Sequence, residues 1–127
     1  MAKGMRELLA EARARIVEID TAEAEAVLAR DERTLFLDVR ESEEFAQGHV
    51  PGALLIPRGM LEPKAAADSP ARDSQLADPE RPIVAYCGSG ARSALAAVTL
   101  AELGFTHVRS MAGGFQAWAA ESRPIDR

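Results

Sequence analysis

Short runs of apolar residues recur along the chain and predict the strands of a sheet. Residues 34–39 and 82–86 are nearly continuous apolar runs, as is typical of strands covered on both faces. A turn at Val50-Pro51-Gly52 leads into a third strand at 53–56. Two shorter runs predict the remaining strands, at 16–19 and 107–109.

Helical patterns separate these runs in the first half of the chain. Apolar residues at helical spacing, with strong helix formers between them, predict an amphipathic lead-in helix over residues 4–15 that serves packing. Asp20 and Glu23 stand in the relation of a capping box and predict a second helix. Ser42 is expected to cap a short helix that stops at Gly48.

The second half of the chain continues the alternation after an irregular segment. Residues 57–82 are rich in Pro, Asp, Ala and Ser, and they predict a long surface connection with one short helix near 74–76. Residues 94–103 predict a helix that ends at a glycine. A double-glycine turn then precedes a closing helix with two aromatic residues that fit core positions: Gly113, Gly114, Phe115 and Trp118.

This alternation of strands and helices predicts an α/β fold with a mostly parallel sheet and helices on both faces. The length of 127 residues falls in the range of one domain. We expect residues 1–15 to form a helical extension and residues 16–127 to form the domain.

The charge balance bears on partners and location. Fifteen basic and twenty acidic residues give a formal net charge of −5, which disfavours binding to nucleic acid and to anionic lipid. The first fifteen residues contain no unbroken apolar run of the kind that a secretory signal or a membrane span needs. A cytoplasmic protein is therefore expected.

Cys87 is the single cysteine, so the chain can form neither an internal disulfide nor a cysteine-rich metal site. It stands where a predicted strand turns into a helix. Backbone N–H groups converge at such a turn, and a helix N-terminus lowers a cysteine pKa from about 8.5 to as little as ~3.5–7.5. The sequence thus predicts a nucleophilic thiolate.

The alternative is a buried cysteine that acts only as a small apolar side chain. The flanking residues argue against it, because two glycines, a serine and an arginine would fill a core poorly but would cradle an anion well. They lie in the segment Cys87-Gly88-Ser89-Gly90-Ala91-Arg92-Ser93.

Four motifs in succession resemble those of the rhodanese family. The resemblance covers roughly residues 16 to 122, and the residues before 16 and those from 62 to 80 lie outside its motifs. The motifs are Leu37-Asp38-Val39-Arg40-Glu41 with Glu44-Phe45; Gly48-His49-Val50-Pro51-Gly52-Ala53 with Ile56-Pro57; Tyr86-Cys87 with Gly90 and Arg92-Ser93; and Gly113-Gly114-Phe115 with Trp118.

The resemblance implies a five-stranded parallel sheet and sulfur transfer in two steps. Cys87 would take a sulfane sulfur from a donor such as thiosulfate, release sulfite, and pass the sulfur to a thiophilic acceptor, either a small thiol or a protein. The N–H groups from Gly88 through Ser89, Gly90 and Ala91 to Ser93 would stabilise the sulfur, and Arg92 would bind the oxyanion end of the donor. No metal or other cofactor is implied.

Several other residues are candidates for supporting roles. Asp38 and Arg40, near a strand end, could orient Arg92 or the loop, or could form a purely structural ion pair. Arg58 could reach the mouth of the site as a substrate contact. His49 is expected to make a structural hydrogen bond rather than to act as a base.

Three other functions compete with sulfur transfer. A phosphatase or arsenate reductase of related fold needs the same cysteine and arginine, but those phosphatases have five residues between the two, whereas four separate Cys87 from Arg92 here. A protein-binding module usually lacks the cysteine. A persulfide carrier that serves one protein partner remains open, as do the physiological donor, the acceptor and the oligomeric state.

Overall fold

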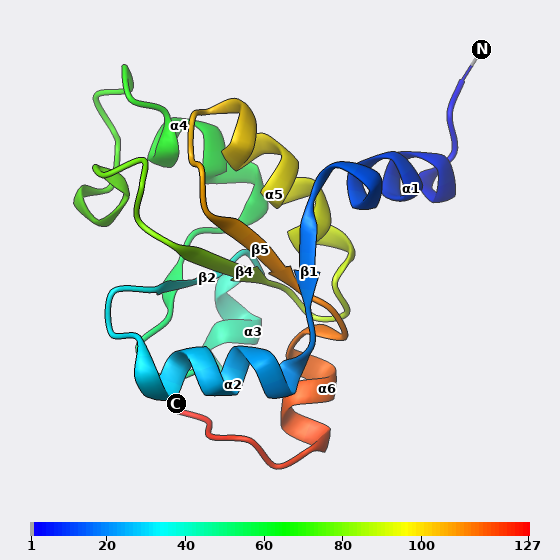
Figure 1. Cartoon of the computed structure of the whole chain (residues 1–127), viewed down its shortest axis with the longest axis vertical. Helices are drawn as coiled ribbons and strands as arrows, with labels where there is room; N and C mark the ends of the chain where they lie inside the picture. The colour runs from blue at the N-terminus through cyan, green and yellow to red at the C-terminus, as the bar shows by residue number, and fades with distance from the viewer. Residues whose placement is uncertain (1) are drawn as a thin grey trace.

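The computed structural model describes residues 2–127, and its centre is a five-stranded sheet (Figure 1). All neighbouring strands are parallel, in the order β1-β5-β4-β2-β3. The predicted α/β class and parallel sheet are therefore confirmed. The strands are β1 (Val17–Ile19), β2 (Leu35–Asp38), β3 (Leu54–Leu55), β4 (Ile83–Tyr86) and β5 (Val108–Met111).

Helices cover both faces of this sheet. One face packs against α4 and α5, and the other against α2 and α6. The α-helices are α1 (Met5–Arg15), α2 (Thr21–Arg30), α3 (Ser42–Ala46), α4 (Leu61–Ala65), α5 (Ala91–Glu102) and α6 (Gly114–Ala120), and two 3₁₀ turns are η1 (Arg58–Met60) and η2 (Ser74–Leu76).

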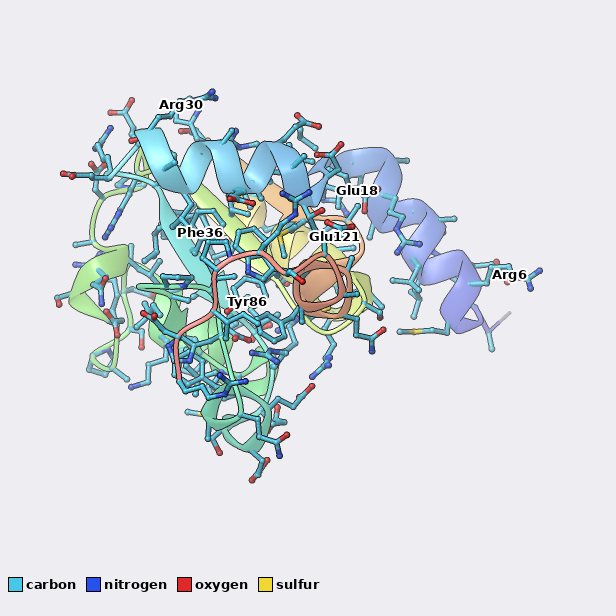
Figure 2. All side chains as sticks on the ribbon, turned by 90° about the horizontal axis from the view of Figure 1, so that it is seen from below. Arg6, Glu18, Arg30, Phe36, Tyr86 and Glu121 are labelled. Atoms are coloured by element: carbon cyan, nitrogen blue, oxygen red, sulfur yellow. The ribbon has the colours of Figure 1, made fainter. Side chains whose placement is uncertain are left out.

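Alternation along the strands divides the interior into two cores. Leu35 and Leu37 of β2 point into the core under α4 and α5, whereas Phe36 points into the core with α2 and α6. Figure 2 shows Phe36 and Tyr86 in the interior below α2, and Arg6 at the outer part of α1. Trp118 is fully buried in the second core, as predicted.

Two helix starts differ from the sequence prediction, and both matter for the site. Gly90 adopts φ +107°, a conformation that favours glycine, and α5 begins directly after it rather than at Ala94. Arg92 and Ser93 consequently lie in its first turn. In α3 the capping residue is Glu41, not Ser42, and its N–H donates to the Glu44 carboxylate at 3.0 Å.

The segment 57–82 contains more structure than predicted. The 3₁₀ turn at 74–76 is confirmed, but η1 and α4 were not predicted. Pro63 stands in the first turn of α4, where a missing N–H removes no helical hydrogen bond. Pro63 therefore argued against a helix in the sequence, although in the structure it lies within α4.

The lead-in helix is confirmed as α1, and it packs beside α5 (Figure 1). Ala12 is its buried residue, whereas Met5 is 55% and Leu8 43% exposed. Among residues 2–127, no helix has the length and apolar character that crossing a membrane requires.

Candidate active site

Cys87 lies directly after β4, and β4 is a central strand of the sheet, between β5 and β2. Ligands in open α/β folds bind beyond the carboxyl ends of the strands, and this cysteine occupies that position. Its exposed fraction is 0%, so the sulfur lies at the base of the loop rather than on the surface.

Backbone donors of the loop converge on the Cys87 sulfur. The N–H of Gly90 donates to Sγ at 3.1 Å and that of Ser93 at 3.4 Å, and the Ser93 hydroxyl oxygen lies 3.6 Å away. Burial alone raises the pKa of the thiol, but the donors from Ser93, Gly90 and Ser89 outweigh burial and lower the pKa. The Ser93 N–H belongs to the first turn of α5, so it has no partner within the helix and can donate to the sulfur.

The N-terminus of α6 holds the other side of the loop. The N–H of Phe115 donates to the Cys87 carbonyl at 2.8 Å, and that of Gln116 donates to the Gly88 carbonyl at 3.0 Å. Since a trans peptide is planar, carbonyls turned toward α6 leave the following N–H groups, those of Gly88 and Ser89, facing away from it. A Cβ at Gly114 would lie 2.6 Å from both carbonyl oxygens, so only glycine allows this approach.

Arg92 forms an ion pair that the sequence did not predict. Its Nη1 donates to Glu44 Oε1 at 2.9 Å and its Nη2 to Oε2 at 3.2 Å, a bidentate arrangement. The hydrogen bond from Arg92 lowers the pKa of Glu44 to about 2, and the pair raises the pKa of Arg92. Both side chains are 39% exposed.

Glu44 was missed as a site residue although it belongs to the first motif. Apart from that motif, its sequence signal is its place in the first turn of a short helix. The structure brings Glu44 to Arg92 across 48 positions in the chain. Gly88 lies next to the pair, and a Cβ at this position would be only 3.2 Å from Arg92 Nη2.

Asp38 and Arg40 bind each other and do not contact Arg92. Arg40 Nη2 donates to Asp38 Oδ2 at 2.8 Å and to the Gly48 carbonyl at 2.8 Å, and both side chains are buried. The Arg40 guanidinium lies 4.3 Å from the centre of the Phe115 ring. This pair therefore supports the loop only indirectly, through the residue whose N–H binds the Cys87 carbonyl.

Arg58 and His49 bind residues outside the Cys87 loop. The Arg58 guanidinium binds Glu62 and the Thr99 hydroxyl, the latter at 2.9 Å, and Thr99 is about 9 Å along α5 from Ser93. The structure thus does not bring Arg58 to the Cys87 loop. His49 Nδ1 donates to the Phe45 carbonyl at 3.1 Å, the structural bond that was expected.

A hollow in the surface lies apart from this loop. It has a volume of about 510 Å³ and is lined by residues around the starts of β4, β5 and β1, among them Pro82, His107 and Val17. The cysteine is at the opposite, carboxyl end of the sheet. Within residues 2–127, no three His, Cys, Asp or Glu side chains are grouped as a metal site requires.

Comparisons with known proteins agree with this arrangement. The family model for the rhodanese-like domain matches residues 20–121. A sulfurtransferase of Allochromatium vinosum is 37% identical over 108 residues, which are 85% of this chain and 92% of that protein. Thiosulfate sulfurtransferase 18 of Arabidopsis thaliana is 32% identical over 119 residues, 87% of this chain and 84% of that one.

A solved structure is similar over the whole chain. It is a protein of unknown function from Rhodopseudomonas palustris, described as a possible tyrosine phosphatase. Its TM-score is 0.93 at 33% identity, with 99% of this chain and 96% of that chain covered.

Proposed function

Because the chain belongs to the single-domain rhodanese-like sulfurtransferase family, we propose that it transfers a sulfane sulfur from thiosulfate or a related donor to a thiophilic acceptor. The transfer proceeds through a persulfide on Cys87. The observation that carries the proposal is the convergence of the Gly90 and Ser93 N–H groups on the Cys87 sulfur.

The first step forms the persulfide. The Cys87 thiolate attacks the outer sulfur of thiosulfate, a new S–S bond forms, and the donor's S–S bond breaks. Sulfite leaves as a dianion with the electron pair of the broken bond, and the terminal sulfur of the persulfide keeps the negative charge that it carried in thiosulfate. The lowered pKa of Cys87 supplies the thiolate for this step.

The second step returns the enzyme to its starting state. An acceptor such as cyanide or a thiolate attacks the terminal sulfur, and the electrons of the S–S bond return to Cys87. We expect the acceptor in the cell to be a small thiol or a protein. A cytoplasmic setting would suit this chemistry, because free thiols stay reduced there.

The loop is suited to hold the terminal sulfur between these steps. The N–H groups of Gly88 and Ser89 face away from α6, and Ser89 is exposed at the surface of the loop. A persulfide adds one sulfur beyond a fully buried Sγ and so moves the reacting atom outward. The loop from Gly88 through Gly90 and Ala91 to Ser93 thus stabilises the charge that the first step delivers.

Arg92 remains available to an anionic donor despite its pairing with Glu44. A guanidinium carries five N–H donors, of which the Glu44 carboxylate uses two. The side chain is 39% exposed, and the neighbouring carboxylate reduces the positive charge that a donor meets. Asp38 and Arg40 support the loop from behind, and we assign no substrate contact to Arg58.

The persulfide itself provides the test. Incubation with thiosulfate and no acceptor should add the mass of one sulfur atom to the intact protein, on the peptide that contains Cys87, and cyanide should remove it as thiocyanate. Cys87→Ser should fold and take up no sulfur, since a hydroxyl forms no persulfide. An adduct in the Cys87→Ser variant, or none in the native protein, would contradict the proposal.

A phosphatase activity is the second candidate, favoured by the description of the Rhodopseudomonas palustris protein. The loop argues against it, because four residues between Cys87 and Arg92 leave less room for the three oxygens of a phosphoryl group. Hydrolysis of an aryl phosphate, measured beside thiocyanate formation, separates the two activities. A stable adduct with slow thiocyanate formation would instead indicate a persulfide carrier.

A further inference from the structure

Behind Cys87 lies a short chain of buried hydroxyl groups. Ser93 Oγ lies 3.6 Å from the Cys87 sulfur, and Ser110 Oγ of β5 lies 2.8 Å from Ser93 Oγ. All three residues have an exposed fraction of 0%. No motif of the sequence includes Ser110, and among residues 2–127 its hydroxyl makes no hydrogen bond to the sulfur itself.

The direction of the hydrogen bond between the two serines follows from their partners. Among residues 2–127, Ser110 Oγ is bonded only to Ser93 Oγ, whereas Ser93 Oγ can also donate to the Gly90 carbonyl at 3.3 Å or to the sulfur. If Ser93 donated to Ser110, the Ser110 proton would have no acceptor, and a buried donor without a partner is unfavourable. Ser110 is therefore the donor, and Ser93 keeps its own proton for the other two acceptors.

We propose that Ser110 is a positioning residue that donates to Ser93 and thereby directs the Ser93 proton toward the sulfur of Cys87. When Cys87 is a thiol, its S–H donates to Ser93, and Ser93 donates to the Gly90 carbonyl. When Cys87 is a thiolate, the Ser93 hydroxyl turns to the sulfur. The Gly90 carbonyl then keeps its bond from the Ala94 N–H at 3.2 Å.

In either state the Cys87 sulfur, the two serine hydroxyls and the Gly90 carbonyl all have a partner, with Ser110 as the fixed end. A donor behind Ser93 also polarises the Ser93 hydroxyl, and such chains strengthen each bond by about 10–30%. The role of Ser110 deepens the proposed function, on which it rests, because it prepares the nucleophile of the first step. The charged groups around the loop are Arg92 on α5, Glu44 on α3 and the Asp38–Arg40 pair after β2.

The thiolate can be measured without any sulfur donor, by its ultraviolet absorbance and by the rate of alkylation with iodoacetamide as the pH is raised. Ser110→Ala should raise the pKa of Cys87 by a few tenths of a unit, and Ser93→Ala by about one unit. The double variant should match Ser93→Ala alone, because Ser110 acts only through Ser93. The charged groups named above are unchanged in each variant.

Two controls separate this role from a loss of packing. Ser110→Thr keeps the hydroxyl and should keep the native pKa of Cys87. Ser110→Val introduces a side chain of nearly the same shape as threonine but without the hydroxyl, and it should raise the pKa of Cys87. Thr21→Val removes a buried hydroxyl whose partner is Glu121, outside the Cys87 loop, and it should leave the pKa of Cys87 unchanged. An unchanged or lowered pKa in Ser110→Ala, or additive shifts in the double variant, would overturn the proposal. Because no sulfur transfer is measured, these results stand apart from the test of the proposed function.

Discussion

Two arginine–carboxylate pairs lie at the carboxyl end of the sheet, and they differ chiefly in burial. Asp38–Arg40 has side-chain exposures of 0% and 5%, whereas Glu44–Arg92 has 39% for each partner. Both include a contact below 3 Å between an arginine nitrogen and a carboxylate oxygen. The chemistry is the same, but water reaches only the second pair.

The difference in burial assigns the two pairs to different tasks. Removing one member of a buried pair leaves a charge without water or partner, and this destabilises the fold strongly. An exposed pair contributes little to stability, but its N–H donors can reach a ligand. We therefore interpret the first pair as part of the framework and the second as part of the site.

Asp38→Asn tests the buried pair and should have the largest effect. The variant keeps the shape of the side chain but leaves the buried Arg40 charge unmatched, so the free energy of unfolding should fall by about 3–5 kcal/mol. Urea unfolding measures it. Asp78→Asn, which breaks the exposed pair with Arg33, is the control and should change the free energy of unfolding by less than about 1 kcal/mol. An equally small change in Asp38→Asn would remove the distinction between the pairs.

Arg92→Ala tests the exposed pair and should act on the reaction rather than on the fold. Loss of a charge-assisted contact of about 1.5–3 kcal/mol should lower kcat/KM for thiosulfate by roughly ten- to a hundredfold. Steady-state thiocyanate formation measures it, and Arg92→Lys should recover only part of the loss because it lacks the bidentate geometry. Equal losses with anionic and uncharged donors would show instead that Arg92 shapes the loop.

The sequence was sufficient for the framework but not for the pairing at the site. Apolar runs located the strands, the capping box of Asp20 and Glu23 located α2, and Asp38 and Arg40 were foreseen as one possible ion pair because both lie near a strand end. Glu44 and Arg92 are 48 positions apart, and their contact depends on how α3 and the start of α5 meet in space. The early start of α5 was missed for a related reason: it depends on the φ of Gly90, which neighbouring residues do not determine.

Glu44→Gln should change the preference among donors by a smaller factor. The variant removes one negative charge beside Arg92, and thiosulfate carries one more negative charge than an alkanethiosulfonate, which offers the same sulfane sulfur. The ratio of kcat/KM for thiosulfate to that for the thiosulfonate should therefore rise, by up to about fivefold for an exposed charge. If Arg92 is less well positioned in the variant, kcat/KM should fall for both donors, since both need that residue, and this fall cancels in the ratio. An unchanged ratio would mean that Glu44 does not influence donor charge.

The smallest expected effect is the pH dependence of stability that Glu44 contributes. The pKa of Glu44 falls from its ordinary value of 4.5 to about 2 in the folded protein, through the hydrogen bond from Arg92. A carboxyl with a lowered folded pKa stabilises the fold above the unfolded pKa, and this contribution disappears as the pH falls through the folded pKa. The difference in free energy of unfolding between the native protein and Glu44→Gln should thus be constant above pH 4.5 and shrink as the pH falls from 4.5 to about 2.

Exposure limits the size of this difference to less than about 1 kcal/mol, and added salt should reduce it further. Glu43→Gln is the matched control, because Glu43 lies next to Glu44 in α3 and forms no ion pair among residues 2–127. Comparing each variant with the native protein at the same pH cancels the titration of the other carboxyl groups. Urea unfolding of the three proteins over this range measures the effect. A difference that grows as the pH falls, or that is equal for Glu43→Gln, would mean that Arg92 does not hold Glu44 in its ionised form.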